Sequence, residues 1–289
     1  MQFGLSLPQF DAFGDVRKLV ELAQAAEAAG WDGFFVWDHV LFDDNWRPMV
    51  DPWVALAAIA ISTERIRIGT LVTPVARRRP WKLARETISI DQLSGGRLIL
   101  GVGLGSPEKW EYGFFGEETD SRIRAEKLDE GLDILLGLWS GELFGYQGKH
   151  YHLEEMRFLP TPVQQPRIPI WVAGMWPNRA PMRRAARFEG AIPLKPSSTL
   201  SPDEWRDALA YIRQHRTSDA PIDAVAMGVT PGDQPERAAE IIASYADAGC
   251  NWWIEDISPY GYGMAWDAYP WPDEMAARLE ERICQGSSR

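Results

Sequence analysis

The stretch IRIGTLVTPVARRRPWKLARETISIDQLSGGRLILGVGLG, residues 66–105, decides the fold. Residues 66–72 and 98–102 are apolar runs, and each predicts a strand. Between them, residues 80–93 carry apolar side chains at helical spacing. Two almost wholly apolar strands around one helix predict a parallel sheet that is buried on both faces, because antiparallel sheets often leave one face polar. The stretch therefore predicts a right-handed βαβ unit.

The same alternation continues along the whole chain. The expected strands are residues 3–7, 33–37, 66–72, 98–102, 168–173, 190–194, 222–229 and 251–257. The expected helices are residues 16–29, 52–61, 80–93, 122–139, 178–187, 201–215, 235–248 and 274–284. Glycines and alternating aromatic side chains in residues 140–166 predict a hairpin inserted after the fourth of these helices. The pattern predicts an α/β fold, a single (β/α)8 TIM barrel over residues 1–289, since the doubly wound alternative usually has fewer strands.

Composition and charge narrow the class of protein. With 289 residues, 45% of them hydrophobic, the chain has the length and composition of a globular protein with a large core. Its net charge of −11 disfavours non-specific binding to nucleic acid, because like charges repel. No apolar run approaches the ~20 residues of a membrane span, and no secretory leader pattern is present. Cys250 and Cys284 are too few for a disulfide framework, so we expect a cytoplasmic protein that does not bind membranes.

TIM barrels carry their functional sites at the carboxyl ends of the strands. The only histidine expected at such an end is His39, which could act as an acid, a base or a hydrogen-bond donor; the alternative is a structural histidine satisfied by nearby backbone. A metal site is not expected, because His150 and His152 fall in the hairpin. The other candidates at strand ends are Ser6, Pro8, Asp38, residues 70–73, residues 103–106, Gly174, Lys195, Thr230, Glu255 and Asp256.

Two further motifs lie at this end of the expected barrel. Gly101-Val102-Gly103-Leu104-Gly105 lacks the third glycine and the downstream acid of a dinucleotide-binding fingerprint, so that interpretation is weak. Residues 77–79 are three consecutive arginines between the third strand and its helix. They could form a solvated charged loop or attract an anionic cofactor tail, and the sequence leaves both open.

Four motifs lie along the expected barrel: Trp37-Asp38-His39, GTLVTP at residues 69–74, DQLSGGRLILGVGLG at residues 91–105, and RAEKLDE at residues 124–130. Together they resemble the luciferase-like flavin-dependent oxidoreductases. This family contains bacterial luciferase, alkanesulfonate monooxygenase and the deazaflavin-dependent dehydrogenases and reductases. The resemblance covers almost the whole barrel, and its motifs are not specific to one reaction.

The resemblance implies a flavin-like cofactor. Members that use the deazaflavin coenzyme F-420 (F420) transfer hydride and are close to this length, so F420 is the expected cofactor. The alternatives are an FMN-dependent monooxygenase, which requires a separate reductase partner, and a flavin-binding protein without turnover. The resemblance also implies a cis non-proline peptide at Thr70-Leu71 that bulges toward the ring. Ser106 stands where the family's sugar-phosphate dehydrogenases have a glutamate, so a sugar phosphate is not the expected substrate.

The residues suggest how such a cofactor would bind. Leu71, Val72 and Val102 supply an apolar surface for a planar ring, and a phosphate would lie on free backbone amides near the start of the helix after Asn178. His39 is the expected catalytic residue, exchanging a proton with a small substrate while hydride passes to or from the ring. The expected cofactor-binding residues are Asp38, His39, Thr70, Leu71, Val72, Gly103, Gly105, Ser106, Gly174 and Asn178.

Aromatic side chains are the expected walls of the substrate pocket, although any one of them could be ordinary packing. They are Trp46, Trp110, Tyr112 and Trp176. The family's barrels often dimerise, so the resemblance implies a homodimer, and the helices at residues 52–61 and 80–93 are the expected contact.

Overall fold

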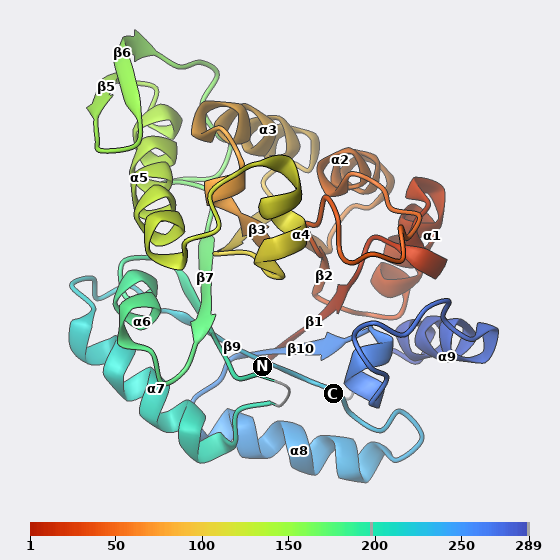
Figure 1. Ribbon diagram of the computed structural model, residues 1–289. Coiled ribbons are helices and arrows are strands. Elements are labelled where there is room, and N and C mark those ends of the chain that lie inside the picture. The colour runs from red at the N-terminus through yellow and green to blue at the C-terminus, as the bar shows by residue number, and fades with distance from the viewer. Residues whose placement is uncertain (197–198, 288–289) are drawn as a thin grey trace.

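The structure is a computed structural model that describes residues 1–196 and 199–287. Within these residues, parallel strands close into a barrel in the order β1-β10-β9-β8-β7-β4-β3-β2, and helices surround it (Figure 1). This confirms the predicted α/β TIM barrel. The barrel strands are β1 (Gln2–Leu7), β2 (Gly33–Val36), β3 (Arg67–Pro74), β4 (Leu98–Gly103), β7 (Ile170–Met175), β8 (Gly190–Leu194), β9 (Asp223–Gly228) and β10 (Trp252–Asp256).

The helices begin where the sequence supplies caps. The carboxylates of Asp15, Asp51 and Asp120 each accept two backbone N–H groups at a helix start, and Ser201 with Glu204 forms a capping box. None of the described helices is both long and apolar enough to cross a lipid bilayer. The helices are α1 (Val16–Ala28), α2 (Pro52–Ser62), α3 (Pro80–Leu93), α4 (Glu108–Glu111), α5 (Ser121–Trp139), α6 (Arg179–Ala185), α7 (Pro202–His215), α8 (Pro235–Asp247) and α9 (Asp273–Cys284).

An antiparallel pair, β5 (Leu143–Gln147) and β6 (His152–Arg157), follows α5 and lies at the edge of the molecule (Figure 1). Its turn is held by Glu130 on α5, whose carboxylate accepts the backbone N–H groups of Lys149, His150 and Tyr151. The pair therefore packs on the outside of the barrel and adds nothing to the barrel's mouth.

Large apolar side chains fill the inside of the barrel. Because side chains alternate along a strand, Trp252 and Ile254 of β10 both point inward, and Asp256 continues this inner face at the carboxyl end. The interior is thus a packed core, and a ligand can bind only above it. The buried residues of this inner cluster are Phe35, Leu71, Ile99, Trp171, Ala173, Ile192, Val225, Trp252 and Ile254.

The end of β3 departs from regular strand geometry. Its register against β4 shifts between Thr70 and Thr73, and a cis non-proline peptide joins Leu71 to Val72. The expected position, Thr70-Leu71, is wrong by one residue. Thr70 is still paired with Leu100 in the ladder, so the irregular segment begins only after it.

Candidate active site

A cavity of about 1750 Å³ opens at the carboxyl end of the barrel, where TIM barrels carry their sites. Its floor is the top of the packed interior, and its walls come from the loops that follow the strands. The apolar floor residues are Leu71, Val72, Ala173, Ile192 and Met227.

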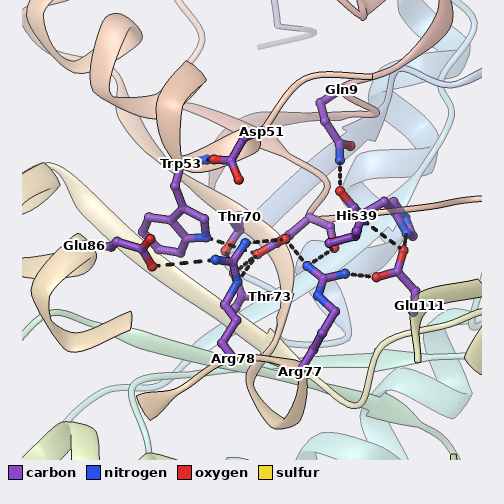
Figure 2. Close-up of polar contacts among 12 residues, drawn as sticks. Gln9, His39, Asp51, Trp53, Thr70, Thr73, Arg77, Arg78, Glu86 and Glu111 are labelled. Carbon is purple, nitrogen blue, oxygen red and sulfur yellow. Dashed lines mark hydrogen bonds and ion pairs between the residues drawn. The ribbon is translucent and has the colours of Figure 1, made fainter. Parts of the chain in front are cut away.

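His39 follows β2 and lines this cavity. Its Nδ1 atom lies 2.8 Å from Oε1 of Glu111, and its backbone carbonyl accepts a hydrogen bond from the Gln9 side chain (Figure 2). Because an ionised carboxylate only accepts hydrogen bonds, this contact places the proton on Nδ1 and leaves a lone pair on Nε2. Burial and the nearby charge of Arg77 lower the pKa of His39 to about 3, so the ring is neutral near pH 7. His39 therefore presents a neutral ring with a hydrogen-bond acceptor to the cavity.

Glu111 positions His39, and sequence analysis missed it. Its carboxylate is fully buried, accepts the backbone N–H of Val40, and forms an ion pair with Arg77. Glu111 lies on α4, a single turn inside the connection that follows β4. Four residues show no helical periodicity, and no pattern separates this glutamate from Glu108 in the same connection.

Asp38 does not point a free carboxylate toward a ligand. Burial opposes its ionisation, but the positive charges of Arg78 and Arg77 lower its pKa below the ordinary value. Both oxygens are already used: Arg78 binds bidentately, and Arg77 forms an ion pair. Trp53 Nε1 and Thr73 Oγ1 donate to Oδ2 at 3.1 and 2.8 Å. Asp38 lines the cavity, but its carboxylate oxygens are held by these protein partners, so its contact with the cofactor stays a prediction.

This network also shows whether the three arginines at residues 77–79 form a solvated charged loop or could attract an anionic cofactor tail. Arg77 and Arg78 lie side by side and turn into the protein, with Arg77 reaching toward Glu111 and His39 (Figure 2). They are neither a solvated loop nor free to bind an anionic tail. Arg79 is exposed and lies over the ring of Trp81.

The structure brings most of the expected cofactor residues to the cavity. Gly103 packs so closely that an added Cβ would lie 2.7 Å from Cγ2 of Val72, so a side chain there would push into the cavity floor. Thr70 is the exception, because its buried hydroxyl contacts Thr73 and the carbonyl of Gly101. The expected residues that do line the cavity are Asp38, His39, Leu71, Val72, Gly103, Gly105, Ser106, Gly174 and Asn178.

Three of the four expected substrate-pocket aromatics lie elsewhere, and only Trp110 lines the cavity. Trp46 is 66% exposed and packs against Phe114. Tyr112 is buried, and its hydroxyl donates to the carbonyl of Leu104. Trp176 packs beneath Arg179 and beside Tyr211.

Other aromatic side chains supply the walls that sequence analysis did not assign. They come from the loops after β2 and β10 and are Trp37, Phe42, Tyr260 and Trp266. Of the polar candidates at strand ends, Asp256 and Lys195 line the cavity. Glu255 and Thr230 instead bond to each other behind the barrel wall. The described residues contain no group of three or more side chains that could hold a metal ion.

The comparisons with known proteins agree with this fold. The family model for luciferase-like monooxygenases matches residues 1–287. The chain belongs to this family. It is 36% identical over 169 residues to an F420-dependent glucose-6-phosphate dehydrogenase of Tsukamurella paurometabola. The aligned region covers 56% of this chain and 48% of the relative. It is also 35% identical over 167 residues to an F420-dependent hydroxymycolic acid dehydrogenase of Mycobacterium tuberculosis. That alignment covers 56% of this chain and 45% of the relative.

The chain thus spans about half the length of these curated relatives. Among solved structures, an F420-dependent secondary alcohol dehydrogenase bound to an F420-acetone adduct superposes with a TM-score of 0.75, covering 88% of this chain and 93% of that one. Because the sequences are only 16% identical, this likeness shows a shared fold.

Proposed function

We propose that this protein is an oxidoreductase that transfers hydride between coenzyme F420 and a small organic substrate. The observation that carries the proposal is the neutral His39 ring, held by Glu111 beside an apolar floor at the barrel mouth. The names of the two relatives, both F420-dependent dehydrogenases, support the choice of cofactor.

The cavity suits an aromatic ring with an anionic tail. Leu71 and Val72 offer an apolar surface on which a planar ring can lie. The cationic side chains of the cavity gather on one side, at Arg124, Arg179, Arg184 and Lys195. Arg124 donates from Nη1 to the carbonyls of Leu104 and Gly105, while its buried Nε has no hydrogen-bond partner among the described residues. Because this Nε is enclosed by protein, a phosphate oxygen in the cavity would meet Arg124 through the charge and the remaining N–H groups of its guanidinium.

F420 supplies the hydride acceptor or donor in this reaction. The protein's part is to hold the ring and to move one proton. His39 Nε2 accepts the proton of a substrate hydroxyl during oxidation and returns it during reduction. Glu111 keeps the imidazole in the required tautomer and orientation.

Cofactor binding tests the proposal directly. We expect F420 to quench tryptophan fluorescence with a micromolar Kd and FMN to bind at least a hundredfold more weakly. The variant Arg124→Met should weaken F420 binding about 10- to 100-fold, because a charged hydrogen bond contributes about 1.5–3 kcal/mol. The matched control, Arg122→Met, changes an exposed arginine two residues earlier on α5 and should leave the Kd unchanged. Tighter binding of FMN, with oxygen consumed during turnover, would instead establish the monooxygenase alternative.

We also propose a homodimer that forms through α2. This helix is apolar on both sides: Trp53 and Leu56 pack into the protein, while Val54 and Ile61 are 60% and 69% exposed. Ala57 and Ala58 lie between these two on the outer face and are only partly buried. An apolar stripe of small and branched side chains suits close helix packing against a second copy.

The variant Ile61→Glu should convert the dimer to a monomer, because it replaces the most exposed apolar side chain of the stripe, at its carboxyl-terminal end, by a charge. Leu143→Glu is the matched control, since Leu143 is also an exposed apolar residue (57%) but lies on the β5–β6 pair. Light scattering after size-exclusion chromatography measures both. A monomeric wild-type protein, or a dimer that survives Ile61→Glu, would contradict the proposal.

A further inference from the structure

The barrel mouth is divided into two opposite arcs. The cationic side chains follow β4, β7 and β8, which are neighbours in the barrel. The side chains of the aromatic chamber, defined as Trp37, Phe42, Tyr260 and Trp266, follow β2 and β10, which flank β1 on the other side. In a closed ring of eight strands these arcs face each other across the cavity.

The aromatic chamber is a stacked set of rings beside His39. The Tyr260 and Trp266 ring centroids are 4.3 Å apart at 21°, and Tyr260 also stacks on Phe42 at 5.9 Å and on Trp37 at 6.1 Å. The His39 ring meets Phe42 edge-on at 5.1 Å. A molecule bound against this wall of the cavity therefore contacts aromatic rings and lies next to the proposed proton acceptor.

Asp256 adds a carboxyl group to the same side. It stands above Ile254 on the inner face of the barrel, lines the cavity, and is paired in the ladder with Ser6, whose Oγ accepts Trp37 Nε1 at 3.0 Å. The carboxyl group is only partly buried: its Oδ1 is enclosed on the side of Ser258, which hydrogen-bonds to the carboxyl group, and the rest of the side chain lines the cavity. Burial raises the pKa of Asp256 to about 7, so the group can donate or accept a hydrogen bond near neutral pH.

The charges around the chamber disfavour an anionic ligand. Asp43, Asp44 and Asp267 line the cavity on this side. Asp43 is paired with Arg47, which also pairs with Asp11, so Arg47 is not free to bind an anion. A phosphate or carboxylate in the chamber would therefore meet the carboxylates of Asp44 and Asp267, with Arg47 already engaged.

We propose that the aromatic chamber and Asp256 form the substrate half of the cavity and take an uncharged, apolar alcohol or ketone whose oxygen bonds to Asp256. This inference rests on the proposed function and names its substrate class. It separates this protein from a sugar-phosphate dehydrogenase, because the cationic arc is reserved for the cofactor's tail.

Two matched probes test the charge preference: benzyl alcohol and 4-(hydroxymethyl)benzoate, which has the same ring and hydroxyl but adds a carboxylate. Each is titrated into protein saturated with F420, and tryptophan fluorescence reports binding. We expect benzyl alcohol to bind at least tenfold more tightly than the benzoate. Equal binding, or tighter binding of the benzoate, would overturn the proposal.

Variants of Trp266 and Asp256 test whether these two side chains bind the substrate. Trp266→Ala should weaken benzyl alcohol binding about tenfold, whereas Trp266→Phe, which keeps a ring, should retain it within threefold. Asp256→Ala should weaken binding about two- to tenfold by removing one hydrogen bond, and Asp256→Asn should restore part of it. The control Asp247→Asn lies on the exposed surface of α8 and should change nothing. Unchanged affinity in both alanine variants would refute the assignment.

The two proposals can fail separately. If F420 binds but benzyl alcohol is not preferred, the substrate inference fails and the proposed function stands. If F420 does not bind, the proposed function fails. In that case benzyl alcohol and 4-(hydroxymethyl)benzoate are titrated into cofactor-free protein. At least tenfold tighter binding of benzyl alcohol would support the charge preference of the aromatic chamber, and equal or weaker binding would overturn it.

Discussion

The variant His39→Gln is expected to lower kcat/KM of the F420-dependent reaction about 10²- to 10⁴-fold, which is the usual contribution of a positioned general acid or base. Glutamine keeps polarity and approximate size but cannot take up a proton, so binding of F420 should change less than threefold. His215→Gln is the control, because His215 is an exposed histidine at the end of α7. An unchanged rate in correctly folded His39→Gln protein would remove His39 from the mechanism.

The pH dependence gives a second check on His39. Its pKa of about 3 lies far below the ordinary value of 6.5, so the ring stays neutral between pH 5 and 8. We therefore expect no break in kcat/KM from His39 in that range. A break near pH 6.5 that disappears in His39→Gln would show that the ring titrates normally and is not held as the structure shows.

The sequence predicts a role for His39 because a single histidine follows a predicted barrel strand, where position alone carries information. Asp38 and His39 both line the cavity, as predicted. The sequence could not predict that the Asp38 carboxylate is held by Arg77 and Arg78, about 40 residues later in the chain, because only the fold brings these residues together.

The errors arise where tertiary contacts, and not local patterns, decide a side chain's direction. Trp46 and Trp176 lie in loops at the expected end of the barrel, but a loop sequence does not say which way a ring points. Glu111 gains its role only because α4 places it against His39 and Arg77. By contrast, the strand and helix pattern of residues 66–105 is local, and the structure reproduces it within two residues, as β3, α3 and β4.

Replacing Asp38 should have the largest effect on stability. Asp38→Leu leaves Arg77 and Arg78 buried side by side with no shared counter-ion, and it removes the acceptor for Trp53 and Thr73. Removing one partner of a buried ion pair costs about 3–5 kcal/mol, and the loss here should lie toward the lower end, because Arg77 keeps Glu111 and Arg78 keeps Glu86 as counter-ions. We expect a loss of this size in the free energy of unfolding, measured by urea denaturation at pH 7. Asp247→Leu, an exposed control on α8, should change it by less than about 0.5 kcal/mol.

A second variant separates charge from packing. Adding Arg78→Met to Asp38→Leu removes one of the two arginine charges that Asp38 had paired and fills similar volume with apolar atoms, so it should recover part of the lost stability.

The pH dependence of the stability has a definite sign, since the pKa of Asp38 is lowered in the folded protein. Its stabilisation is present above the unfolded-state value of 3.8 and is lost as the pH falls below it. If Asp38→Leu costs less than about 1 kcal/mol, or the double variant is less stable than the single one, the ion-pair network does not hold this wall of the site together.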